Sequence, residues 1–328
     1  MKEIGGYFGL EQLVSNEYYK ELIPLNTGRN VLLYVLKARN IKKLYIPYYL
    51  CNSVSDMCIR NGYKFKYYKI DAEFMPIFNK TLADDEYLYV VNYYGQLANE
   101  KIFSLKHQFV QIILDNTQAF FQKPIEGIDT IYSCRKFFGV PDGAYLSTNK
   151  RLSEELEIDI SRERMTHILG RYEGMASDYY SHFWNNDTSL KSEPLKHMSK
   201  LTHNILGAID YDRVRRIRNE NYAYLERELS KQNKLEFIAP DGAFAYPFYV
   251  ENEMEIRKAL VKKKIYITTL WPNVLTDTLK ECIEYKYAKN ILPLPCDQRY
   301  GIDDMKCLVG EIRKCINWEN FAKKIYQI

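Results

Sequence analysis

The sequence lacks the features that mark several common protein classes. Its 328 residues include 7 cysteines, with no Cys-x-x-Cys pair, and 5 histidines without the spacing of a metal site. This pattern argues against a disulfide framework or a zinc knuckle and favours a reducing compartment. The amino terminus breaks its apolar residues with Glu3, Gly5, Gly6 and Glu11, so neither a signal peptide nor a membrane span is expected. We therefore expect a cytoplasmic protein with no metal and no membrane partner.

A strong charge of one sign is also absent. Lys and Arg number 46 against 42 Asp and Glu, for a net charge of +4, and no basic stripe dominates. Composition therefore gives no reason to expect a nucleic-acid partner. The basic run Arg213, Arg215, Arg216 and Arg218 lies in a predicted helix, and we interpret it as a solvated or interfacial face. The Walker loop and the Gly-x-Ser-x-Gly nucleophile motif are missing too.

The first half of the sequence alternates between two hydrophobic periods. Helix patterns at 27–40 and 53–62, the second closed by Gly62, alternate with strand patterns rich in β-branched and aromatic residues at 42–49, 64–71, 86–95, 110–116, 129–134 and 143–148. Such alternation predicts an α/β fold with a mostly parallel sheet flanked by helices. Active-site residues in these sheets lie just beyond the carboxyl ends of the strands, where Asp115 and the segment 133–136 fall.

The second half predicts a different architecture. The segment 183–194 is interpreted as a loop before a helix at 195–206, and 210–233 is the clearest helix, capped by Asp210 or Asp212. Beyond it the patterns predict two strands within 236–250, a helix at 253–265, a strand at 290–297 and a helix at 302–316. We therefore expect a large domain over residues 1–234 and a small α+β domain over residues 235–328.

Two segments suggest cofactor chemistry at the carboxyl ends of strands. Thr27 and Gly28 open a helix, where backbone N–H groups and the helix dipole bind phosphate well, although an ordinary cap by Asn26 or Thr27 is the alternative. Asp115 ends an apolar strand, and a carboxylate there is costly unless a positive group pairs with it. The protonated pyridine nitrogen of pyridoxal phosphate is one such group, and capping of the next turn is the alternative.

A third segment supplies a nucleophile. Lys136 stands between an apolar strand and a turn rich in Phe, Gly and Pro, where we expect burial. Burial disfavours the ammonium form and helps the amine to attack an aldehyde. Ser133, three residues earlier, has a hydroxyl that suits a phosphate oxygen. A surface lysine in a strand-to-helix loop is the alternative, but the order of a phosphate-type loop, a strand-end Asp and a later Lys favours a cofactor site.

These segments resemble the DegT/DnrJ/EryC1/StrS family of sugar aminotransferases, which have the aspartate-aminotransferase fold (fold type I). LDNTQAF at 114–120 is similar to the family's Asp-x-x-Gln-Ala motif, and RKFFGVPDGAYL at 135–146 to its Lys followed by a glycine-rich strand start. IPYYLC at 46–51 and VNYYGQLAN at 91–99 match two further segments. The family's segment that contacts the neighbouring subunit's cofactor is not recognisable, and MSKLTHNIL at 198–206 takes its place in the sequence.

The resemblance implies pyridoxal 5'-phosphate as cofactor and a homodimer with sites at the subunit interface. It implies a Schiff base at Lys136, Asp115 on the pyridine nitrogen and Gln118 against the cofactor. The remaining implied cofactor contacts are Thr27, Gly28 and Arg29 in the phosphate loop, Tyr49 and Cys51 at the strand end that covers the ring, and Ser199 towards the neighbouring subunit. Arg29 stands where the family has a small hydroxyl residue.

The activity implied is transfer of an amino group, from glutamate by analogy, to a keto acceptor. By the same analogy the acceptor is a nucleotide-linked keto-sugar for surface polysaccharide or antibiotic synthesis. Lys136, once released, would serve as general base and acid. Two alternatives stay open: another activity of the same cofactor and fold, such as a lyase or decarboxylase, and a non-catalytic scaffold or regulator that retains the fold.

Overall fold

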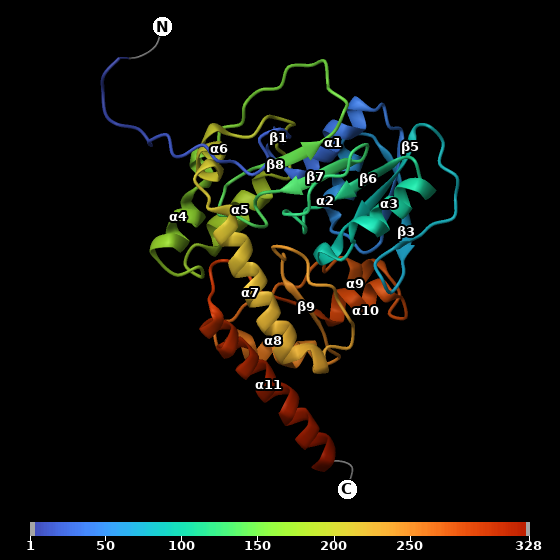
Figure 1. The fold of residues 1–328 in the computed structure, drawn as a ribbon, viewed down its shortest axis with the longest axis vertical. Coiled ribbons are helices and arrows are strands. Elements are labelled where there is room, and N and C mark those ends of the chain that lie inside the picture. Colours follow the sequence, from blue (N-terminus) through green and yellow to red (C-terminus); the bar gives the residue numbers. More distant parts are fainter. Residues whose placement is uncertain (1–3, 326–328) are drawn as a thin grey trace.

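The computed structural model describes residues 4–325, with side chains described up to residue 316. Its main sheet has eight strands in the order β1-β8-β7-β6-β5-β2-β3-β4 (Figure 1). Their bounds are β1 Ile23–Leu25, β2 Lys43–Pro47, β3 Lys64–Ile70, β4 Pro76–Ile77, β5 Glu86–Val91, β6 Ile112–Asp115, β7 Asp129–Ser133 and β8 Ala144–Ser147.

The centre of this sheet is parallel, as the sequence predicts. β7, β6, β5, β2 and β3 pair in parallel, while β8, β1 and β4 are antiparallel to their neighbours at the two sides. Most of the central strands are buried along nearly their whole length, which explains why they read as continuous apolar runs. The parallel strands end at one edge, so the residues that follow them are brought together there.

Two helices beside the sheet, α1 and α2, form where the sequence predicts them. α1 (Gly28–Ala38) packs against β7 and β8 and is capped by Thr27, whose hydroxyl oxygen accepts a hydrogen bond from the Asn30 N–H. α2 (Asn52–Arg60) packs against β3 and ends before Gly62, which has φ +71° and so adopts the left-handed conformation common after helices. α3 (Asn99–Gln108) and the 3₁₀ turn Tyr93–Gly95 follow β5.

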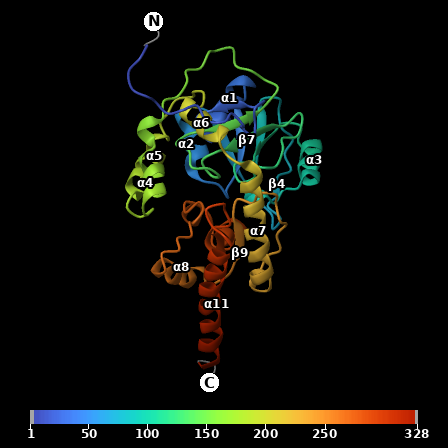
Figure 2. The ribbon, with the colours of Figure 1, turned by 60° about the vertical axis from the view of Figure 1, so that its left-hand side comes forward.

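Residues 183–194, predicted as a loop, are largely helical. A 3₁₀ turn at Arg162–Arg164 leads into α4 (Thr166–Glu173) and α5 (Tyr180–Ser189), which pack against each other and stand to one side of the sheet (Figure 2). Polar residues dominate α5, so its sequence has no helical stripe. Tertiary contacts stabilise this helix instead. The buried Asn186, for example, donates a hydrogen bond to the Pro141 carbonyl.

Two helices then lead away from the sheet. α6 (Lys200–Gly207) lies within the helix predicted at 195–206, except for its last residue. α7 (Tyr211–Leu229) is capped by Asp210, which accepts from the Arg213 N–H, and it continues into a 3₁₀ turn at Ser230–Gln232. α7 descends from the sheet towards the carboxy-terminal part (Figure 1).

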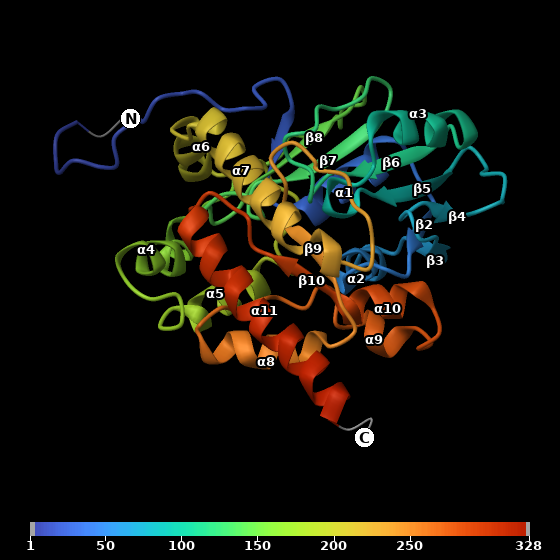
Figure 3. The ribbon, with the colours of Figure 1, turned by 60° about the horizontal axis from the view of Figure 1, so that its bottom comes forward.

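The carboxy-terminal part is a two-stranded sheet with helices. β9 (Tyr246–Tyr249) pairs antiparallel with β10 (Ile291–Leu294), and the helices are α8 Glu253–Lys262, α9 Val274–Asp277, α10 Ile283–Asn290 and α11 Ile302–Ile325. α11 packs along α7 and α8 (Figure 3). A separate hydrophobic cluster joins β9, β10, α8 and α11 to the second half of α7, whereas Val274 of α9 and Tyr287 of α10 belong to the core of the main sheet. The boundary at residue 234 stays a prediction.

One of the two strands predicted within 236–250 does not form. The backbone N–H and carbonyl of Ile238 are both hydrogen-bonded by the side-chain amide of Gln96, at 2.8 and 2.9 Å. A side chain therefore satisfies the groups that a strand partner would have used. Among residues 4–325 no helix is long and apolar enough to cross a membrane. Among the described side chains, no group of three or more His, Cys, Asp or Glu could hold a metal ion.

Candidate active site

The carboxyl edge of the main sheet brings several of the predicted site residues together. Asp115 is the last residue of β6, and Ser133 is the last residue of the neighbouring parallel strand β7. β1 lies on the far side of β8 and runs in the same direction as β7, so the Thr27–Gly28 turn opens at this edge as well. A methyl group added at Gly28 would lie 3.7 Å from the Thr117 methyl carbon. The start of α1 therefore adjoins the turn after β6.

Asp115 is held in place by two donors. Asp115 is only 5% exposed. One of its carboxylate oxygens accepts a hydrogen bond from the Tyr89 hydroxyl at 2.7 Å, and the other accepts one from the Thr117 N–H at 2.8 Å. Burial and the neighbouring Asp115 charge raise the pKa of Tyr89 far above its usual value, so its hydroxyl remains a donor. No ion pair of the described residues includes Asp115, which leaves the buried carboxylate free to accept from a cationic ligand.

Lys136 reaches the same turn from the other strand. Its Nζ donates to the Thr117 hydroxyl oxygen at 2.8 Å, and the Thr117 N–H donates to Asp115. Thr117 thus links the amine and the carboxylate. Thr117 was not among the predicted site residues. Its hydroxyl, two residues after an Asp at the end of a strand, is the sequence signal that points to it.

The expectation that Lys136 is buried is wrong for this single chain. Lys136 is exposed, whereas Phe137 and Phe138 on its carboxyl side are 3% and 5% exposed. The turn is fixed by the N–H groups of Phe137 and Phe138, which both donate to the Cys134 carbonyl. This geometry sends the two rings into the core and leaves Lys136 exposed at the surface, with its amine against the Thr117 hydroxyl.

Two arginines flank this edge. Arg29, next to Gly28, has a buried Nη1 without a hydrogen-bond partner among the described residues, and burial lowers its pKa. Arg135, next to Lys136, contacts Asp187 of α5 at 3.3 Å, and burial lowers its pKa as well. Arg135 was not among the predicted site residues, and its place beside Lys136 is the only sequence signal for it. The two guanidinium groups suit an anionic ligand.

Gln118 and Ser133 lie close to this arrangement. Gln118 is buried, and its side-chain oxygen accepts from the Tyr94 N–H at 2.7 Å, which supports a turn where Tyr94 has φ 54°. Ser133 is half-buried at the end of β7. Their contacts with a cofactor stay predictions.

The strand end at 46–51 packs differently from the prediction. Tyr49 is fully buried, with its ring centroid 4.5 Å from Trp271 and 5.0 Å from Tyr93, both in edge or tilted contacts. Because the ring is enclosed by other aromatic side chains, this packing argues against the predicted contact with a cofactor ring. Cys51 is half-buried just before α2, with its sulfur 2.7 Å from the Ser53 hydroxyl.

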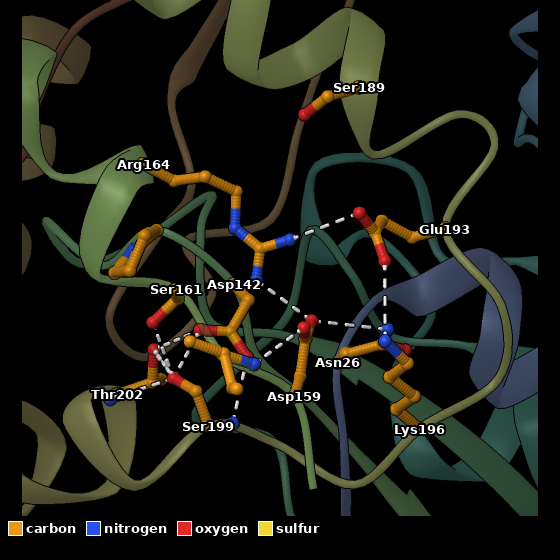
Figure 4. A network of polar contacts seen from close by, with 12 residues as sticks. Asn26, Asp142, Asp159, Ser161, Arg164, Ser189, Glu193, Lys196, Ser199 and Thr202 are labelled. Atoms are coloured by element: carbon orange, nitrogen blue, oxygen red, sulfur yellow. Dashed lines mark hydrogen bonds and ion pairs between the residues drawn. The ribbon is translucent and has the colours of Figure 1, made fainter. Parts of the chain in front are cut away.

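Ser199 also has a structural position. It caps α6 and is 1% exposed, and its hydroxyl contacts Asp142 at 2.7 Å and Ser161 at 2.6 Å in a polar network that Figure 4 shows. Thr202 donates to the same Asp142 carboxylate. These contacts turn Ser199 inward and argue against the predicted contact with a neighbouring subunit's cofactor, which no comparison tests.

Replacing Ser199 with alanine is therefore expected to lower stability and to leave ligand binding unchanged. The variant loses the α6 cap and one donor to the buried Asp142, at a cost of about 1–2 kcal/mol. Thermal or urea unfolding measures the loss, with the exposed Ser192→Ala as control. A variant with normal stability and weakened cofactor binding would contradict this assignment.

Comparisons with known proteins agree on the fold. No family model and no curated protein matches the sequence. Solved structures do: a DegT DnrJ EryC1 StrS aminotransferase from Brucella abortus matches with a TM-score of 0.61 and 14% identity over 89% of this chain and 85% of that one. The sugar aminotransferase CalS13 from Micromonospora echinospora matches with a TM-score of 0.59 and 14% identity over 89% and 87%.

A third match is NtdA from Bacillus subtilis with bound cofactor PMP, with a TM-score of 0.62 and 12% identity over 90% of this chain and 73% of that one. The chain therefore has the fold of the DegT/DnrJ/EryC1/StrS aminotransferases. The predicted fold class, an α/β fold type I protein, is confirmed.

Proposed function

We propose that this chain belongs to the DegT/DnrJ/EryC1/StrS family and is a pyridoxal-5'-phosphate-dependent aminotransferase. The observation that carries the proposal is the arrangement around Thr117, which joins the Lys136 amine to the Asp115 carboxylate at the carboxyl edge of the sheet. Two of the similar structures are described as an aminotransferase and a sugar aminotransferase, and a third holds PMP.

The residues present fit this cofactor in three places. Asp115 is a buried carboxylate with no cation in the described ion pairs, as a protonated pyridine nitrogen requires. Lys136 supplies a primary amine beside it. The start of α1, with Thr27 and Gly28, offers backbone N–H groups to a phosphate, and the unpartnered buried Nη1 of Arg29 suits the same anion.

Each residue then has a chemical task. When bound, pyridoxal 5'-phosphate would supply the electron sink and carry the amino group between donor and acceptor. Lys136 would hold the cofactor covalently and, once released, move a proton at the carbon that bears the amino group. Thr117 orients the lysine amine, while Tyr89 and the Thr117 N–H orient the Asp115 carboxylate.

The substrates follow from the resemblance. We propose glutamate as the amino donor and a nucleotide-linked keto-sugar as the acceptor, for surface polysaccharide or natural-product synthesis. CalS13, one of the similar structures, is a sugar aminotransferase. The site has buried or half-buried guanidinium groups at Arg29 and Arg135, which suit the carboxylates or phosphates of such substrates.

We further propose that the enzyme works in the cytoplasm as a homodimer. Lys136 is exposed in the single chain, although an active-site amine functions best where water is excluded. A second subunit over this edge would provide that exclusion. The 7 cysteines are scattered along the sequence with no Cys-x-x-Cys pair, which suits a reducing compartment.

A half-reaction tests the proposed activity. Protein loaded with pyridoxal phosphate and mixed with glutamate alone should release one equivalent of 2-oxoglutarate per site and then stop until a keto acceptor is added. A lyase or decarboxylase would instead turn over repeatedly without 2-oxoglutarate, and a binding protein would release nothing. Either result would contradict the proposal.

A further inference from the structure

Arg218 of α7 is buried, although it belongs to a run of arginines predicted to form a solvated or interfacial face. It is 1% exposed, while Arg215 and Arg216 have side chains 38% and 63% exposed and form ion pairs. No ion pair of the described residues includes Arg218. An arginine without a carboxylate in the interior is costly, and burial lowers its pKa. Its contacts therefore call for an explanation.

The guanidinium group donates to three different segments. Its Nη1 donates to the Ala243 carbonyl at 2.7 Å, its Nε to the Gln298 side-chain oxygen at 2.9 Å and its Nη2 to the Phe137 carbonyl at 3.2 Å. These partners come from the turn after β7 and from two loops of the carboxy-terminal part. Arg218 thus connects the turn that carries Lys136 to the loops before β9 and after β10.

Phe137 is held more firmly than its neighbours. Its carbonyl accepts a second hydrogen bond, from the Gln298 side-chain nitrogen at 2.7 Å, and the Arg218 guanidinium lies 4.6 Å from the centroid of its ring. Two donors and a stacked cation therefore fix both the backbone and the ring of the residue that follows Lys136. The held carbonyl belongs to the peptide that joins Phe137 to Phe138, and the N–H of the same peptide donates to the Cys134 carbonyl. Because this peptide is planar, fixing its carbonyl also fixes the hydrogen bond that closes the turn carrying Lys136.

We propose that Arg218, with Gln298, is the positioning residue that directs Lys136 towards Thr117. The inference rests on the proposed function for its catalytic meaning, but its geometry does not depend on the cofactor. Arg218 fixes the Phe137 carbonyl, this fixes the turn, and the turn aims the amine at the Thr117 hydroxyl 2.8 Å away.

A neighbouring residue provides a matched control. Asn221, also on α7 and 1% exposed, donates to the Cys296 carbonyl at 3.2 Å and the Tyr300 carbonyl at 2.9 Å. It therefore supports the same loop that carries Gln298, but in the described structure it makes no hydrogen bond with Phe137. An effect of Arg218 through general stability would be shared by Asn221→Ala, and an effect through Phe137 would not.

The experiment measures the reactivity of Lys136 in protein without cofactor. Arg218→Lys, Gln298→Ala and Asn221→Ala are treated briefly with a limiting amine-acylating reagent over a range of pH. Acylation of Lys136 is quantified by peptide mass spectrometry against the exposed Lys262 and Lys263. Unfolding midpoints are measured for each variant, so that changes in reactivity are compared at known stability.

We expect Lys136 to be acylated about threefold to tenfold faster in Arg218→Lys and in Gln298→Ala, because the amine is freed from Thr117. Asn221→Ala should leave the Lys136 rate unchanged even when its unfolding midpoint falls. Equal Lys136 acylation rates in wild type, Arg218→Lys and Gln298→Ala would overturn the proposal. An increase of the same size in Asn221→Ala would overturn it too. Gln298→Ala retains the arginine, so the test remains decisive if the arginine variant fails to fold.

A second readout separates this inference from the proposed function. In protein loaded with pyridoxal phosphate, Arg218→Lys should lower kcat about tenfold or more with little change in the KM for glutamate, since Arg218 lies behind the turn and not beside the substrate. If wild-type protein binds no cofactor while the acylation rates still differ as expected, the proposed function fails and the positioning role stands.

Discussion

Lys136→Ala is expected to abolish covalent attachment of pyridoxal phosphate and to reduce transamination at least about a thousandfold. The amine is the group that holds the cofactor, and afterwards it is the base and acid for the proton transfer, a role worth about 10² to 10⁴ in rate. No other lysine is hydrogen-bonded to Thr117 in the described structure. Measurement of 2-oxoglutarate release from glutamate gives the size of the effect.

Stability should be unaffected, because Lys136 is exposed and its side chain fills no core space. Lys37→Ala, which removes a surface lysine paired with Glu154, serves as the control and should retain full activity. A Lys136→Ala protein that still releases 2-oxoglutarate at near the wild-type rate would contradict the assignment of this residue.

Asp115→Asn is expected to reduce transamination about a hundredfold to a thousandfold while covalent capture by Lys136 continues. The neutral amide has nearly the same shape, but it cannot stabilise a positive charge on the pyridine nitrogen, and loss of one such electrostatic partner has effects of this size. Steady-state kinetics and borohydride trapping, measured on the same preparation, separate the two properties.

Tyr89→Phe is the matched control for that substitution. It removes one donor to Asp115 but leaves the carboxylate and the Thr117 N–H in place. The expected loss is about tenfold or less, the size of one hydrogen bond. If Tyr89→Phe were as damaging as Asp115→Asn, the carboxylate charge would not be the decisive property of the site.

The fold and the centre of the site were predictable because both depend on local patterns. Short apolar runs ending in Asp115 and Ser133 predict parallel strands, and the rule that strand ends share one edge brings these residues together. Thr27 and Gly62 mark helix ends through backbone chemistry that is visible in sequence.

Contacts between distant segments were not predictable in the same way. Tyr49 and Ser199 occupy positions where the resemblance places ligand contacts, but their burial depends on Trp271 and Asp142, far away in the sequence. The exposure of Lys136 depends on which of its neighbours enter the core. Similarly, the Gln96 side chain, far away in the sequence, occupies the backbone groups of Ile238 where a strand was predicted.

Arg218 is a case where the sequence held a signal. It stands four residues after Val214 and four before Tyr222, both buried, so it lies on the apolar stripe of α7. A charged residue on such a stripe either extends to solvent or finds polar partners inside. The carbonyl groups of Phe137 and Ala243 accept hydrogen bonds from Arg218 and so stabilise its side chain in the interior. A helical sequence pattern does not reveal these partners.

The central claim is that Lys136 and Asp115 form a pyridoxal-phosphate site. The most direct test is to mix purified wild-type protein with pyridoxal phosphate, record the visible spectrum, reduce with borohydride and map the modified peptide by mass spectrometry. The predicted result is a yellow protein in which reduction fixes one cofactor per chain on Lys136. A protein that stays colourless, or carries the label on a different lysine, would contradict the claim.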